Sequence, residues 1–270
     1  KALIEEISES LLAAYAPLPL LDNYDIYQLL LDYWHAVMQD DVYVLCQDGW
    51  AAGKVLRELK VDKGEKLKET PDLVLGKSKY KAELLPPALL VARFFSDEQA
   101  AIDALQAAAD EASQALESYL EEQGGEEGLL SDAANDAGKI NAASLKARLK
   151  QASDAEEKAA LKTAIKLFEA ESQAKKAVKE AQEALDRAVV ARYPKLLESE
   201  IKQLLVEDKW RASLQAAIEA EIERITQQLA NRVKELEERY SATLPQLTQQ
   251  VADLEAKVAA HLKSMGLEWA

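Results

Sequence analysis

Apolar residues recur every three or four positions through most of the chain after residue 95, which is the spacing of an amphipathic α-helix. The first such stripe, after Ser96, consists of Ile102, Leu105, Ala109, Ala112, Leu116 and Tyr119. The second stripe ends near residue 190 and consists of Ala160, Thr163, Leu167, Ala170, Ala174, Ala177, Ala181, Ala184 and Ala188. Alanine side chains fill little space, so this stripe needs a partner helix at close approach. We therefore predict an antiparallel helical hairpin over 96–192, with a loop near 124–141.

Capping signals support these boundaries. Ser96 and Gln99 have the spacing of a capping box, and Ser153 with Glu156 forms a second one before the alanine-rich helix. A shorter helical piece is expected around Leu145.

Two further apolar stripes follow Pro194, and Pro245 separates them. They consist of Ile218, Ile222, Ile225, Leu229, Val233, Leu236 and Tyr240, and of Leu247, Val251, Leu254, Val258, Leu262 and Met265. Asp208 is placed to cap the first of these helices. Similar lengths and a short connection predict a C-terminal hairpin within 193–270. Two helices alone would leave their stripes partly in water, so we predict that a partner chain packs on Ile218 to Leu236 and on Leu247 to Val258.

Residues 1–95 have a different pattern. Asp25 is placed to cap a helix whose apolar stripe consists of Ile26, Leu29, Leu30, Tyr33 and Val37. The run Val42–Cys46 reads as a short buried strand, Leu73–Leu75 reads as a second strand, and Pro86-Pro87 opens a helix over 88–95. These pieces indicate the edge of a larger α/β domain. The predicted fold class is therefore mainly α, with long coiled-coil-like helical hairpins and a small mixed α/β N-terminal part.

Composition narrows the function classes. The formal net charge is −15, whereas a protein that binds DNA through a broad basic surface is normally basic, so we expect any DNA contact to be local or to depend on a partner. The single cysteine, Cys46, cannot form an internal disulfide, and we expect a core residue rather than a reactive thiol. This cysteine usage, with neither a signal peptide nor a membrane-spanning apolar run, predicts a cytoplasmic protein without membrane contact. The chain begins at Lys1 rather than at methionine, which suggests the cut end of a longer polypeptide.

The usual catalytic motifs are absent from the sequence. There is no G-x-G, and therefore neither a dinucleotide fingerprint nor a Walker A loop, and there is no H-E-x-x-H or G-x-S-x-G. His35 and His261 lie far apart on predicted helices, and both are expected to be ordinary helix residues. The pair Asp40-Asp41 is interpreted as a helix terminus. We predict no catalytic, cofactor-binding or metal-binding residue.

One segment differs in charge from the rest of the chain. Between Lys54 and Lys81 there are nine basic and five acidic residues, a local net charge of +4. Candidates for contact with a DNA backbone are Lys54, Arg57, Lys77, Lys79 and Lys81, with Tyr80 placed to lie against a sugar or base. The alternative is a solvated loop. Phosphate contact predicts an affinity that falls with salt.

Several short strings together resemble one family. In the N-terminal part they are Tyr24-Asp25-Ile26-Tyr27-Gln28, Asp32-Tyr33-Trp34, Met38-Gln39-Asp40-Asp41-Val42-Tyr43, Asp48-Gly49-Trp50, Lys81-Ala82-Glu83-Leu84-Leu85-Pro86, Ala88-Leu89-Leu90-Val91-Ala92-Arg93-Phe94-Phe95 and Gln99-Ala100-Ala101-Ile102. Later strings are Tyr193-Pro194-Lys195-Leu196, Glu200-Ile201-Lys202, Asp208-Lys209-Trp210 and Leu244-Pro245-Gln246-Leu247. In order and spacing they resemble the C-terminal region of the modification (M) subunit of type I restriction-modification systems, over nearly the whole chain.

The resemblance implies a subunit of an adenine-N6 DNA methyltransferase that uses S-adenosylmethionine. In that family two M subunits assemble with one specificity subunit, which reads the DNA, and restriction subunits join to cleave unmodified DNA. The C-terminal helices of M are expected to pack on spacer helices of the specificity subunit. The family's catalytic signature is Asn-Pro-Pro followed by an aromatic residue, whereas Pro86-Pro87 stands between Leu85 and Ala88 here. No catalytic or cofactor residue is therefore carried over.

Two other functions remain open at this stage. The chain could be a self-associating coiled-coil scaffold unrelated to DNA modification, with its stripes covered by copies of itself. An enzyme with an unrecognised site in residues 1–95 would require a pocket with converging ionisable side chains, for which the sequence gives no sign.

Overall fold

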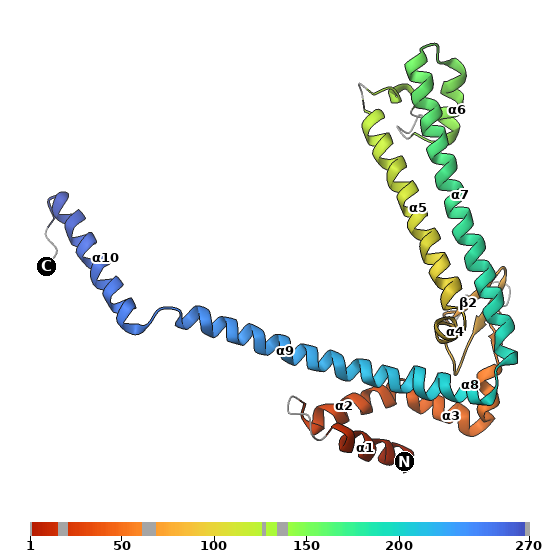
Figure 1. The fold of residues 1–270 in the computed structure, drawn as a ribbon, viewed down its shortest axis with the longest axis horizontal. Helices are drawn as coiled ribbons and strands as arrows, with labels where there is room; N and C mark the ends of the chain where they lie inside the picture. Colours follow the sequence, from red (N-terminus) through yellow and green to blue (C-terminus); the bar gives the residue numbers. More distant parts are fainter. Residues whose placement is uncertain (1, 16–20, 61–68, 126–127, 134–139, 268–270) are drawn as a thin grey trace. The chain divides into compact units, whose positions relative to one another are not determined.

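The computed structural model describes residues 2–15, 21–60, 69–125, 128–133 and 140–267. They form long helices and one small antiparallel sheet, so the predicted mainly α fold class is confirmed (Figure 1). The chain divides into two compact units, residues 1–36 with 212–270 and residues 37–211. This grouping differs from the three consecutive segments predicted from the sequence, because helices from the two ends of the chain pack together.

The larger unit, residues 37–211, contains two long helices. Its α-helices are α3 (Gln39–Asp48), α4 (Pro87–Phe94), α5 (Ser96–Gln123), α6 (Ala142–Gln151), α7 (Ala155–Arg192) and α8 (Glu198–Lys202). The 3₁₀ turns are η2 (Trp50–Lys54), η3 (Ser131–Ala133) and η4 (Tyr193–Lys195), and η5 (Gln203–Arg211) is a π-helix. The predicted helix after Pro86 is confirmed by α4, whose first turn contains Pro87. Proline is tolerated in a first helical turn because the N–H that it lacks would have no helical partner there.

The sheet consists of β1 (Arg57–Glu58), β2 (Leu73–Leu75) and β3 (Ser78–Lys81) in the order β1-β3-β2, all antiparallel. The strand predicted at 73–75 is therefore confirmed. Leu75 pairs with Ser78 across a two-residue turn, in which Gly76 has a φ of 61°. A turn with a positive φ at its first central residue matches the twist of the two strands and favours glycine there.

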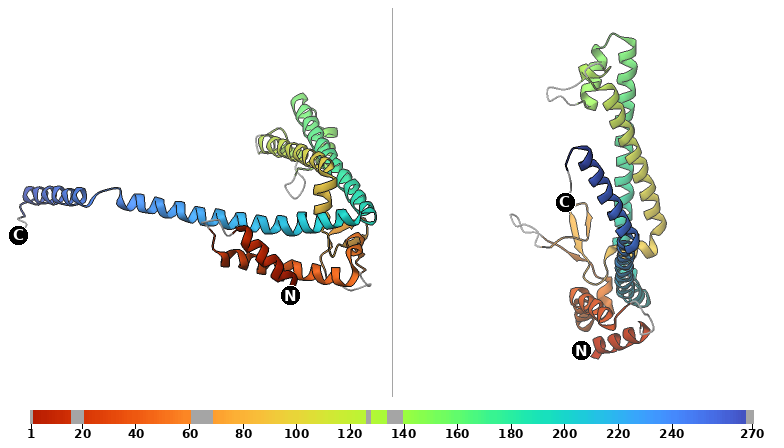
Figure 2. Two further views of the ribbon diagram at one scale, coloured as in Figure 1. Left: turned by 60° about the horizontal axis from the view of Figure 1, so that its bottom comes forward. Right: turned by 90° about the vertical axis from the view of Figure 1, so that its left-hand side faces the viewer.

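The helices α5 and α7 lie side by side and antiparallel, as predicted (Figures 1 and 2). Near one end of the pair, the Tyr119 hydroxyl donates a hydrogen bond to the Ala160 carbonyl at 3.3 Å. Further along, the Ser113 hydroxyl donates to a Glu171 carboxylate oxygen at 3.0 Å. We call this hairpin, α5 with α7, the arm.

The packed face of α7 differs in detail from the predicted stripe. Thr163 and Ala170 are exposed, whereas the buried residues of this helix are Ala160, Leu161, Ala164, Leu185 and Val189. Over 38 residues a 3.6-residue helix drifts away from a strict 3-4 repeat, so the buried face passes to neighbouring leucine and valine side chains. On α5 the buried residues Ile102, Ala109 and Leu116 all belong to the predicted stripe.

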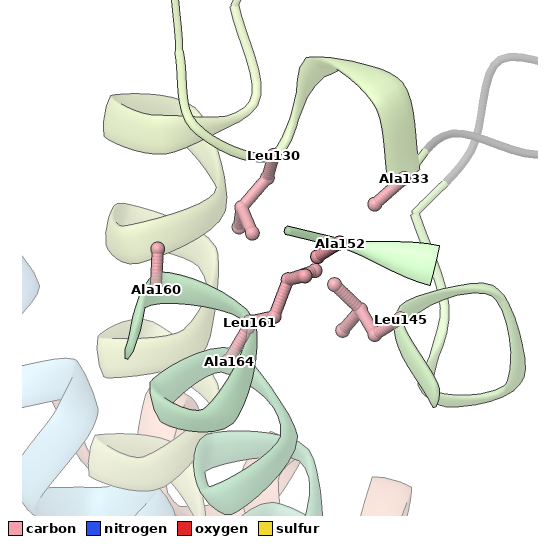
Figure 3. Packing of buried hydrophobic residues seen from close by; sticks show 7 residues of the cluster. All are labelled: Leu130, Ala133, Leu145, Ala152, Ala160, Leu161 and Ala164. Carbon is pink, nitrogen blue, oxygen red and sulfur yellow. The ribbon is translucent and has the colours of Figure 1, made fainter. Parts of the chain in front are cut away.

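A small core closes the end of the arm (Figure 3). It contains Leu130, Ala133, Leu145, Ala152, Ala160, Leu161 and Ala164. Leu130 and Leu145 are fully buried, so the described part of the predicted loop near 124–141 is not simply a solvated connection. It includes η3, while residues 126–127 and 134–139 lie outside the described residues.

The second unit contains α1 (Ala2–Tyr15), α2 (Asn23–Tyr33), α9 (Ala212–Tyr240) and α10 (Leu244–Ser264). Between α2 and α3 the chain forms a π-helical turn, η1 (Trp34–Met38). Leu21, Ile26 and Ile218 form one buried cluster of this unit, and partly buried side chains from α1, α2 and α9 pack around it.

The strand predicted at Val42–Cys46 is wrong, because these residues lie in α3. The buried side chains of this region are Met38 and Asp41, with Leu45 half-buried, which is helical spacing. Cys46 is exposed and is therefore not a core residue. Valine and tyrosine in the run suggest a strand by their propensity, but the burial of one helical face decides the conformation.

Four predicted caps also differ from the structure. Asp22, rather than Asp25, caps α2 and accepts a hydrogen bond from the Tyr24 N–H at 2.8 Å. Asp154, rather than Ser153, caps α7. Phe95 precedes α5 without a side-chain cap, so the capping box that begins at Ser96 does not form. Asp208 lies inside η5 and caps no helix. Several Ser and Asp residues occur close together at these boundaries, and spacing alone does not choose among them.

Candidate partner-binding helices

The apolar stripe of α9 begins in a covered region. Ile218 is only 2% exposed, and Ile222 and Ile225 are half-buried against side chains of α1 and α2. These three residues were predicted to contact a partner chain. In the structure they pack within the chain, because the helices at the N-terminal end supply Leu11, Leu12, Tyr15 and Leu29 as their cover.

Beyond Ile225 the same stripe is open. Three of its residues on α9 and four residues of the stripe on α10 have exposed fractions between 37% and 58%. They are Leu229, Val233, Leu236, Leu247, Val251, Leu254 and Val258, and we call them the open stripe. Tyr240 adds a further exposed side chain between the two groups. All seven belong to the set predicted to bind a partner.

The predicted packing of α9 against α10 is not observed in the described residues. No residue of α10 is buried, and the helix does not return along α9 (Figures 1 and 2). Thr243, just before α10, has the extended backbone angles usual for an N-cap residue, φ −71° and ψ 152°. The short connection therefore permits a hairpin but does not impose one.

Local sequence signals define α10 at both ends. The Thr243 N–H donates to the Gln246 side chain at 3.0 Å, and Pro245 occupies the first turn. At the other end Gly266 has a φ of 76°, and the Leu267 N–H donates to the Leu262 carbonyl at 3.0 Å. This is a Schellman motif. The helix is thus well specified, although it buries nothing.

Charged side chains outside the stripe of α9 pair with one another. Arg232 forms an ion pair with Glu235 at 2.5 Å. About two turns earlier, Arg224 pairs with Glu221. The hydrogen bond from Arg224 lowers the pKa of Glu221 below its ordinary value. Over residues 226–265 the sequence has five basic and five acidic residues, so this segment is neutral in a chain of net charge −15.

Comparison with known proteins adds no assignment. No family model, curated protein or solved structure matches the chain.

A buried polar network in the larger unit joins residues that are distant in sequence. Asp41 is 3% exposed and accepts hydrogen bonds from Lys209 Nζ at 2.7 Å and from Trp210 Nε1 at 2.8 Å. Lys209 also donates to the Leu84 carbonyl at 2.8 Å. A buried ion pair is stable only when its remaining hydrogen-bonding groups are satisfied, and these contacts satisfy them.

A second set of contacts lies in the same unit. The Tyr193 hydroxyl donates to the Leu85 carbonyl at 2.6 Å, and burial raises the pKa of Tyr193 well above its usual value. Arg93 pairs with Asp208 at 3.0 Å, and Arg192 stacks 4.5 Å above the centre of the Phe94 ring.

Sequence reasoning did not find this network. Asp41 was interpreted as a helix terminus, and Asp208 as a cap. A signal was nevertheless present, because Asp208, Lys209 and Trp210 are the three consecutive residues of one string in the family resemblance. In the structure Asp208 accepts from Arg93, while Lys209 and Trp210 both donate to Asp41. An aspartate on the buried face of a helix needs such partners.

The basic candidates for DNA contact are divided. Arg57 pairs with Glu69 and Glu83, which raise the pKa of its guanidinium further, and Lys81 pairs with Asp72 at 2.9 Å. For Lys54, Lys77 and Lys79 the structure shows no ion pair among the residues that it describes. The predicted phosphate contact is therefore concentrated on these three lysines, two of which lie at the turn between β2 and β3 and on β3.

The described residues contain no group of three or more His, Cys, Asp and Glu side chains placed to share a metal ion. His35 and His261 are both exposed. None of the described helices has the length and apolar content needed to cross a membrane. A hollow between α4 and α5 is lined mainly by small side chains, including Ala88, Ala92 and Ala100, with Asp103 as its acid.

Proposed function

We propose that this chain is an assembly region, whose open stripe on α9 and α10 binds helices of a partner polypeptide. The observation that carries the proposal is the exposure of seven leucine and valine side chains, three along one face of α9 and four along one face of α10. Burial of the exposed half of such a side chain contributes roughly 1 kcal/mol, so the seven together are worth on the order of 7 kcal/mol. This is as large as the stability of many domains.

We further propose that the chain is the C-terminal region of the M subunit of a type I restriction-modification system. The support is the resemblance of its strings, together with the contacts that those strings make. Asp41, Leu84, Arg93, Tyr193 and the Asp208–Trp210 triplet come from five separate strings, and all belong to the hydrogen-bonded contacts of one unit. Contacts between residues of separate strings are expected if these strings together specify the fold of one family.

On this proposal the partners are the specificity subunit, a second M subunit and the restriction subunit, in the cytoplasm. The parent complex methylates adenine N6 with S-adenosylmethionine, while this chain, which lacks Asn-Pro-Pro with an aromatic residue, contributes no catalytic group. DNA is reached through the complex, and Lys54, Lys77 and Lys79 are the proposed backbone contacts. Their replacement by alanine should make DNA binding less salt-dependent, with the logarithmic slope falling by about one for each phosphate that is no longer bound.

Co-expression with the specificity subunit tests the assembly role. Leu236→Asp places a charge on the open stripe, and binding should weaken by about 100-fold or more, because a buried unpaired carboxylate costs several kcal/mol. Asn231→Asp is the matched control, since Asn231 is exposed on the opposite side of the helix. It should bind like the unchanged chain.

Two outcomes would overturn the proposals separately. If the unchanged chain fails to associate with the specificity subunit at low salt, the family assignment is wrong. If both aspartate variants bind equally well, the open stripe is not the binding surface. Methyl transfer from S-adenosylmethionine by the chain alone would also contradict the assignment.

A further inference from the structure

The two groups of the open stripe are mirror images of one another along the chain. Leu229 and Val258 lie equally far from the point midway between Thr243 and Leu244. The other pairs with this property are Val233 with Leu254, Leu236 with Val251, Tyr240 with Leu247, Ile225 with Leu262 and Ile222 with Met265. In an antiparallel pair of helices, residues placed in this way face each other layer by layer. Each stripe is thus the complement of the other.

The two complementary stripes do not pack against each other within the chain. No residue of α10 is buried, so α10 does not cover α9. An element that is complementary to its own chain but separated from it by a short open connection is the arrangement from which identical chains exchange elements. In such an exchange the same layers form between α9 of one copy and α10 of another.

We propose that a second copy of this chain covers the open stripe, with α9 of each copy antiparallel to α10 of the other. One two-fold axis near Thr243 then closes both seams at once. Each copy contributes eight large exposed side chains, the open stripe and Tyr240. At about 60 Å² for each side chain, the two seams bury about 1,000 Å², the size at which specific interfaces begin.

The net charge of residues 226–265 is compatible with a second copy of the chain as the partner. Two chains of net charge −15 repel each other, but residues 226–265 carry no net charge, so the copies meet through their neutral segments. The proposal goes beyond the assembly role, because it concerns the chain without its partner. A partner helix and a second copy need the same side chains and therefore exclude each other.

Cysteine cross-linking of the full chain tests the arrangement. Cys46 is exposed and is first replaced by serine, so that it cannot react. Val233→Cys and Leu254→Cys are then made separately. A mixture of the two single variants should give a covalent dimer under mild oxidation, whereas each variant alone should not. The matched control is Asn231→Cys mixed with Ala256→Cys, which have the same mirror relation on the outer faces and should not cross-link.

The other outcomes each overturn the proposal. If the chain carrying both cysteines gives only a cross-linked monomer, the hairpin closes within one chain. If Val233→Cys alone gives a dimer, the copies pair in parallel or with another register. If light scattering finds a monomer at concentrations up to about 1 mM, where even weak specific association appears, no second copy binds. Because no specificity subunit is present, these outcomes are independent of the test of the proposed function.

Discussion

The arm and the pair α9–α10 share the same apolar spacing, but only the helices of the arm pack against each other. Both consist of two long helices with apolar residues at intervals of three and four. The arm closes within the chain, because the core around Leu130 and Leu145 holds its two helices together at one end. The connection between α9 and α10 has no buried residue, and their stripes remain exposed. Periodicity therefore predicts a helix and its apolar face, while the connection decides whether that face is covered.

Truncation in the core of the arm should have the largest effect. Leu161 is fully buried, and Leu161→Ala should lower the free energy of unfolding by about 3 kcal/mol, through reduced burial and the cavity left behind. Leu254→Ala should change the stability of the dilute chain by less than about 0.5 kcal/mol, because its side chain is mostly exposed. Urea denaturation at low protein concentration measures both. Equal costs would mean that α10 is packed in the monomer.

Enlargement of a small residue should have the next largest effect. Ala164 is fully buried beside Leu161, so Ala164→Leu should destabilise the chain by about 2 kcal/mol through overpacking. Ala256 is exposed on α10, and Ala256→Leu should have almost no cost. Thermal unfolding of the two variants provides the measurement, and a stable Ala164→Leu variant would show that the core of the arm is loosely packed.

Removal of a cap separates the two regions on a smaller scale. Asn141 accepts hydrogen bonds from the N–H groups of Ala143 and Ser144, and Asn141→Ala should cost about 1 kcal/mol of global stability. Gln246→Ala removes a similar bond from α10, but this helix supports no core. Hydrogen exchange should therefore show local fraying of α10 with unchanged protection in the arm. Loss of protection in both regions would contradict the separation.

The smallest expected effect depends on pH. Hydrogen bonds from Lys175 and then from Ser113 lower the pKa of Glu171 in the arm. A lowered folded-state pKa stabilises the protein above the ordinary glutamate pKa, and this contribution is lost as the pH falls through the folded value. The stability difference between the unchanged chain and Glu171→Gln should therefore shrink between about pH 5 and pH 3. A difference that is constant over this range would exclude the contribution.

The sequence predicts elements better than partners. The arm, the strand Leu73–Leu75 and both C-terminal helices follow from periodicity and turn residues. Val42–Cys46 was assigned to a strand because local propensity and helical burial disagree there, and only the packed structure shows which one decides. Ile218 and Leu229 belong to one stripe, yet one is covered and the other exposed. No local pattern carries that difference, since the cover comes from helices about 200 positions earlier in the sequence.

The ion pair between Asp41 and Lys209 has a consequence for synthesis. Its two residues are 168 positions apart. At a translation rate of roughly 5–20 residues per second, Asp41 leaves the ribosome about 8–34 seconds before its partner. The arm depends only on residues that lie between them, so it can fold during that interval. The larger unit is therefore completed late, when the triplet Asp208-Lys209-Trp210 emerges and brings α3 into place.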